Sequence, residues 1–85
     1  MKWEVQHVDK PAGLRRNYEY IFHNLIDEDD NLLGWVREDV INKVCTPATN
    51  AHSRVDYLWS NSKYNLEDAK AELIAFFVKE RLDNA

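Results

Sequence analysis

The spacing most like that of a metal site lies in an acidic segment, residues 27–38. Asp27, Asp29 and Asn31 stand at alternate positions in this segment, and Glu38 closes it. Oxygen ligands at these offsets are typical of a calcium hand, in which a short loop between two helices ends in a bidentate glutamate. The spacing therefore raises the hypothesis of a calcium-binding loop at 27–38.

Two features of the same segment favour a turn without a metal. A calcium hand needs glycine at its sixth loop position, but this chain has Leu32 there and places Gly34 two residues later. The residues on either side of the acidic run are rich in aromatic and β-branched types, which are typical of strands. We therefore expect the Asp and Asn side chains to form the tip of a β-hairpin, with no cofactor.

Cysteine and histidine offer a second kind of chemistry. Cys45, His7, His23 and His52 are of the types that bind zinc, but structural zinc sites use close ligand pairs, and the sequence has none. A Cys–His catalytic pair would need an orienting third group and an oxyanion site, and no glycine-rich turn offers one. The sequence thus predicts no catalytic residue and no metal ligand, and it favours a protein that is not an enzyme.

Composition narrows the class of protein further. The 85 residues are expected to form one domain, 1–85, and 45% of them are hydrophobic, which is enough for a core. The net charge of −4 argues against a nucleic-acid partner, since such domains usually need a basic surface. The lone cysteine is typical of a reducing compartment, and the longest apolar run, residues 73–78, is too short to cross a bilayer. We expect a soluble, cytoplasmic protein with no membrane partner.

Alternating and aromatic-rich segments predict the strands that would position these groups. The predicted strands are residues 2–8, 16–26, 32–36 and 54–60. Residues 10–13 have the composition of a type I turn between the first two strands. The segment 39–53 is the least defined, because its first half fits a short helix or a strand extension and Pro47 indicates a loop.

A C-terminal helix is predicted over residues 66–81. Asn65 suits the N-cap, and acidic residues in the first turn with basic residues near the end suit the helix dipole. Leu73 and Phe77 lie on an apolar stripe at helical spacing, so we expect both to be buried against the sheet. The predicted fold is α+β: an antiparallel sheet of three to four strands with one C-terminal helix packed on one face. This compact acidic layout resembles that of many small proteins of phages and mobile elements.

The strand at 16–26 is apolar on both faces, which bears on function. One helix covers one face of a sheet, so the second face must meet residues 39–53, a second copy of the chain or another protein. Large exposed apolar patches on soluble proteins mark interaction sites. Although most Trp and Tyr residues are expected in the core, some suit an interface. The predicted interaction surface consists of Tyr18, Tyr20, Phe22, Trp35, Tyr57 and Trp59.

Two functions of different classes follow. The favoured one is a non-enzymatic protein-interaction module, acting as a homodimer or as an adaptor or inhibitor of another protein, and a two-fold dimer of micromolar affinity is expected. The alternative is a small-molecule-binding domain with an aromatic pocket between sheet and helix, in which His23 or His7 would be the polar group. The calcium-binding loop at 27–38 is a remote third hypothesis.

Overall fold

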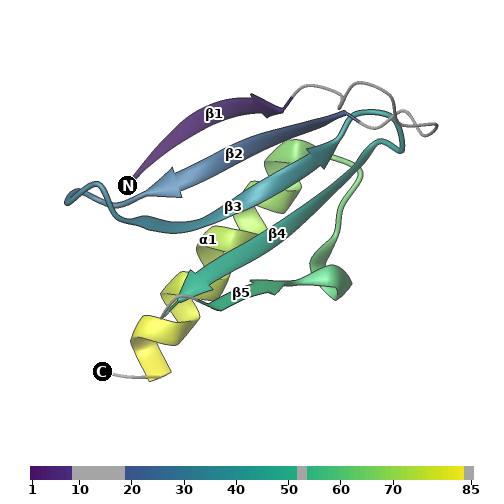
Figure 1. Cartoon of the computed structure of the whole chain (residues 1–85). Helices are drawn as coiled ribbons and strands as arrows, with labels where there is room; N and C mark the ends of the chain where they lie inside the picture. The colour runs from purple at the N-terminus through teal and green to yellow at the C-terminus, as the bar shows by residue number, and fades with distance from the viewer. Residues whose placement is uncertain (9–18, 52–53, 84–85) are drawn as a thin grey trace.

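The period-two segments of the sequence form a sheet, and the C-terminal apolar stripe forms the helix that packs on it. In the computed structural model, which describes residues 1–8, 19–51 and 54–83, these make a five-stranded antiparallel sheet in the order β1-β2-β3-β4-β5 and one long helix (Figure 1). The elements are β1 (Lys2–Val8), β2 (Tyr20–Ile26), β3 (Leu32–Asp39), β4 (Val44–Ala51), β5 (Arg54–Tyr57), η1 (Trp59–Asn61) and α1 (Leu66–Asp83). The predicted α+β class is confirmed, with five strands rather than three to four.

The additional strand is β4, and the loop expected at Pro47 is therefore wrong. Pro47 pairs with Val36 of β3, and its carbonyl oxygen accepts a hydrogen bond from the backbone nitrogen of Leu58 at 2.8 Å. In an antiparallel strand the nitrogen and oxygen of one residue point to the same side. The proline nitrogen, which carries no hydrogen, thus faces the side where regular pairing with β5 ends at Ala48, and the β3–β4 ladder is undisturbed.

Residues 27–31, the start of the acidic segment, form the turn of the β2–β3 hairpin, as predicted. One carboxylate oxygen of Asp27 accepts hydrogen bonds from the backbone nitrogens of Asp29 and Asn31, at 2.8 and 2.9 Å. The hydrogen bonds from Asn31 lower the pKa of Asp27, because they favour its ionised form. Strands flank this turn, where a calcium hand would have helices. The turn predicted at 10–13 lies outside the described residues.

Helix α1 begins where the sequence predicts. The side-chain oxygen of Asn65 accepts hydrogen bonds from the backbone nitrogens of Glu67 and Asp68, at 2.8 and 3.4 Å, which is the arrangement of an N-cap. Glu67 and Asp68 also place negative charge in the first turn. Within the described part of the chain, no helix has the length and apolar character needed to cross a membrane.

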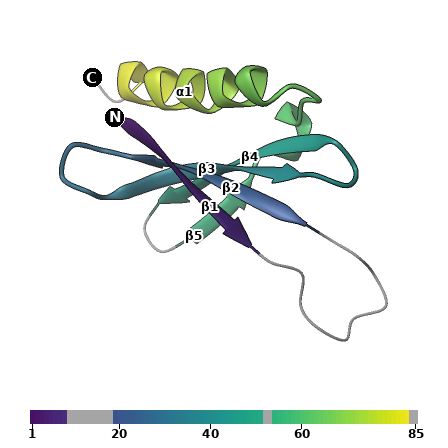
Figure 2. The same ribbon diagram turned by 90° about the horizontal axis from the view of Figure 1, so that it is seen from above.

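The core lies between the sheet and α1, which form the two layers visible in Figure 2. Its central residues are Leu25, Val36, Cys45, Ala69 and Leu73. Leu73 is fully buried, as expected, and Phe77 is partly buried against this cluster. Burial of these side chains between the layers is the main force that holds α1 on the sheet.

Strands β3 and β4 approach each other closely at Gly34. A Cβ atom at this position would lie 2.3 Å from the carbonyl oxygen of Ala48, which is closer than side chains tolerate. Gly34 also pairs with Leu25 across the β2–β3 hairpin, on the face that meets α1. Glycine therefore allows the two backbones to come together beneath the core.

Candidate functional site

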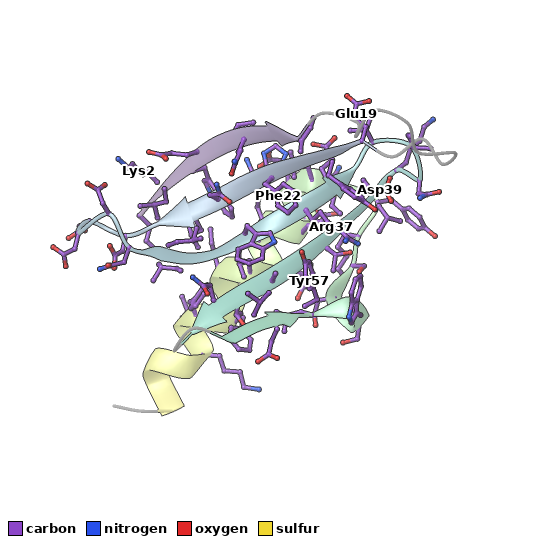
Figure 3. All side chains as sticks on the ribbon, viewed as in Figure 1. Lys2, Glu19, Phe22, Arg37, Asp39 and Tyr57 are labelled. Atoms are coloured by element: carbon purple, nitrogen blue, oxygen red, sulfur yellow. The ribbon has the colours of Figure 1, made fainter. Side chains whose placement is uncertain are left out.

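The register of the strands decides which side chains face away from α1. His23 and Leu25 are buried on the helix side of β2, and successive side chains of a strand alternate, so Tyr20 and Phe22 point to the other side. We call the sheet face turned away from α1 the outer face. Phe22, Arg37 and Tyr57 all lie on it in Figure 3, where the helix is behind the sheet.

Five aromatic side chains form a continuous row on the outer face. Successive ring centroids lie 6.4, 6.4, 6.0 and 5.0 Å apart, within the range in which aromatic pairs attract. The first three contacts are edge-to-face and the last is stacked, with an interplanar angle of 21°. We call this row the aromatic band; in order, it is Tyr20, Phe22, Trp35, Tyr57 and Trp59.

The band crosses β4 because β4 has small side chains there. Ala48 pairs with Trp35 of β3 on one side and with Tyr57 of β5 on the other. The two rings meet over Ala48, which is 0% exposed, and the indole nitrogen of Trp35 donates a weak hydrogen bond of 3.4 Å to the Tyr57 hydroxyl. Thr46, the next β4 side chain on this face, is also buried and is hydrogen-bonded to Ser62 at 2.8 Å. A long side chain at position 48 would separate the two halves of the band.

Arg37 lies among the rings of the band. Its guanidinium carbon is 4.7 Å from the centroid of Tyr20, 5.1 Å from that of Tyr57 and 5.3 Å from that of Trp59. These distances are typical of cation–π contacts. Among the described residues Arg37 forms no ion pair with a carboxylate, and its Nε is buried without a hydrogen-bond partner. The rings thus hold a positive charge in place without neutralising it.

The carboxylate that follows on the same strand is engaged elsewhere. Asp39 accepts hydrogen bonds from the backbone nitrogen and side-chain amide of Asn42, at 3.0 and 2.8 Å. Burial alone would raise the pKa of Asp39, but these hydrogen bonds, together with the charge of Arg37, outweigh it and the pKa is lowered. Asp39 is therefore an ionised cap of the β3–β4 turn that feels the charge of Arg37 without forming an ion pair with it.

The sheet face beneath α1 contains a second polar cluster. His23, which is 6% exposed, contacts Glu38 through Nε2 at 2.8 Å, while its Nδ1 is buried without a hydrogen-bond partner. Glu38 pairs with Cys45 across β3 and β4, and burial, together with the charge of Glu38, raises the pKa of the Cys45 thiol. A thiol that stays protonated is a poor nucleophile. The arrangement therefore supplies no activated cysteine.

One cavity lies near this cluster, beside the start of α1. It has a volume of about 260 Å³, and its lining residues include Glu38, Cys45, Leu66 and the aromatic Tyr64. Within the described ranges, no three His, Cys, Asp or Glu side chains come close enough together to hold a metal ion. His52, which was considered as a zinc ligand, lies outside the described residues, and so does the side chain of His7.

Most of the interaction residues predicted from the sequence come together. Tyr20, Phe22, Trp35, Tyr57 and Trp59 form the band, and Tyr18 lies outside the described residues. Sequence reasoning missed the contributions of Arg37 and Ala48. Strand alternation from Trp35 would have placed Arg37 on the same face. Nothing in the sequence indicates that Ala48 separates two aromatic strands.

Comparisons of the chain with protein-family models, with curated proteins and with solved structures found no match. The function is therefore argued from the geometry and chemistry of the band.

Proposed function

We propose that the protein is a non-enzymatic protein-interaction module that binds through the aromatic band. The observation that carries the proposal is the gathering of two tryptophans, two tyrosines, a phenylalanine and Arg37 on the outer face. Trp, Tyr and Arg are the residues that dominate binding energy at protein interfaces. The rings already contact one another, so binding orders few additional side chains and loses little entropy.

The chemistry of the band supports a protein partner over a nucleic acid. Aromatic sheet faces can stack bases, but such sites also need several cations along the path of the phosphates. In the part of the chain that the structure describes, Arg37 is the one cation in contact with the rings of the band, and the whole chain has a net charge of −4. The occupant is then another protein or a second copy of this chain. The two-fold dimer expected from the sequence stays a prediction.

The degree of exposure suits an interface that forms and separates. Trp59 is 60% exposed, and Val55, on the same face as Tyr57, is 48% exposed. The other rings of the band are half-buried by one another. A partner that covers these groups removes apolar surface from water, and this burial favours binding by about 25 cal/mol of free energy per Å².

A pair of exposed aromatic residues offers a matched test. Trp59 belongs to the band, whereas Tyr64, which is 88% exposed, lies outside it beside α1. Proteins captured from the source cells by the wild-type chain should also be captured by Tyr64→Ser and lost with Trp59→Ser. Circular dichroism would establish that both variants are folded. Capture of the same proteins by Trp59→Ser and by the further variant Tyr57→Ser would contradict the proposal.

Sedimentation distinguishes the two classes of occupant. If a second copy covers the band, the wild-type chain at tens of micromolar should sediment as a dimer and Trp59→Ser as a monomer. If another protein covers it, the purified chain should be monomeric. A dimer that persists in Trp59→Ser would place self-association on a different surface.

A further inference from the structure

We infer that the partner presents a carboxylate to Arg37 from among apolar side chains, and that this partner is another protein, not a second copy of the chain. The inference rests on the proposed function and specifies the chemistry of the bound segment. It follows from the position of one charge within an otherwise aromatic surface.

The first step is the state of the guanidinium. Three rings surround the Arg37 carbon at 4.7 to 5.3 Å, and Nε has no hydrogen-bond partner. In the unbound protein, water can solvate the parts of Arg37 that reach the surface, since the residue is only half-buried. The charge is thus tolerated as long as the outer face is wet.

The second step is what a partner does to that charge. A surface that covers Tyr20, Tyr57 and Trp59 also removes water from Arg37, because the guanidinium touches all three rings. Burial of a charge without an opposite charge or acceptor is strongly unfavourable. A carboxylate matches the planar fork of guanidinium donors and can accept two hydrogen bonds at once. The partner must therefore bring this group to the centre of an apolar contact.

The third step concerns a second copy as occupant. Arg37 touches Tyr20 at one end of the band and Trp59 at the other, so it lies near the middle. A two-fold copy centred on the band would bring two guanidinium groups together, and like charges oppose association. Among the described residues, the outer-face carboxylate of Glu4 contacts Lys2 at 3.5 Å. That of Asp39 accepts hydrogen bonds from Asn42 at 3.0 and 2.8 Å and is stabilised by the Arg37 charge of its own chain. The chain is thus poorly complementary to itself at this surface.

Selection from a library of random linear peptides displayed on phage tests the inference. The wild-type protein should enrich peptides in which Asp or Glu is flanked by apolar residues. Their dissociation constants should rise by about 30-fold or more in Arg37→Glu, and by less in Arg37→Lys, which keeps the charge but loses the planar fork. Selection against Arg37→Glu should enrich Lys or Arg instead. Circular dichroism and melting curves would establish that both variants are folded.

The possible results separate this inference from the proposed function. Some peptides could lose affinity for Trp59→Ser but bind Arg37→Glu as tightly as wild type. This result would overturn the proposed contact between a partner carboxylate and Arg37, and it would leave the band as the binding surface. Peptides indifferent to both substitutions, or no enrichment at all, would overturn both proposals. A wild-type dimer that Arg37→Glu dissociates would show that the occupant is a second copy.

Discussion

Replacement of Leu73 by alanine tests how α1 is held on the sheet. Leu73 is 0% exposed and belongs to the cluster formed with Leu25, Val36, Cys45 and Ala69. Because both layers surround it, the cavity left by truncation cannot easily collapse, and we expect a loss of about 3–5 kcal/mol. A domain of 85 residues has a total stability of about 4–13 kcal/mol, so this loss is a large fraction of it.

Thermal and urea unfolding followed by circular dichroism would measure the effect. For a domain of this size, each kcal/mol of lost unfolding free energy lowers the melting temperature by about 4–8 °C. Leu73→Ala should therefore melt at least about 12 °C below wild type. Phe76→Ala is the matched control on the same helix, because Phe76 is 38% exposed, and we expect it to lose about 1 kcal/mol. A Leu73→Ala protein that melts within about two degrees of wild type would refute the packing of α1 on the sheet.

Three further outcomes follow from the structure. Gly34→Ala should destabilise the protein by about 1–3 kcal/mol or more in urea unfolding, since the new Cβ would lie 2.3 Å from the Ala48 carbonyl oxygen; wild-type stability would contradict this close approach. The pKa values of Asp27 and Asp39 are lowered from 3.8, so their contribution to stability is full above that pH and is lost as pH falls through the lower folded values. The melting temperature should therefore fall as the pH is lowered below about 4, and this fall should be smaller in Asp27→Asn. Because burial raises the pKa of Cys45, its thiol should react with iodoacetamide at pH 8 far more slowly in the folded protein than in urea; equal rates would mean that the thiol is accessible.

The sequence predicts the elements whose signals are local. The N-cap at Asn65 and the apolar stripe around Leu73 are set by neighbours within a few residues, and the structure has both. The turn at Asp27 is likewise formed by its own side chain. The two apolar faces of β2 indicated an uncovered surface, because alternation alone assigns residues to faces.

Features that depend on pairing between distant strands could not be predicted in this way. β4 is formed because β3 and β5 provide partners on both sides, although Pro47, Ala48 and Asn50 have a poor intrinsic strand preference. The position of Arg37 over rings from β2, β5 and η1 depends on register across the whole sheet. Trp59 was expected to continue a strand, but it begins the short helix η1 and joins the band by stacking on Tyr57.

The three tryptophans can report directly on whether binding occurs at the aromatic band. Trp35 and Trp59 belong to the band, whereas Trp3 packs on the core cluster of the opposite face, with the ammonium of Lys70 4.9 Å from its ring. Nitrogen-15 NMR resolves the indole N–H signal of each during a titration with a peptide selected by the wild-type protein. The signals of Trp35 and Trp59 should shift or broaden while that of Trp3 stays in place. A shift of Trp3 alone, with Trp35 and Trp59 unmoved, would contradict the assignment of the band as the binding surface.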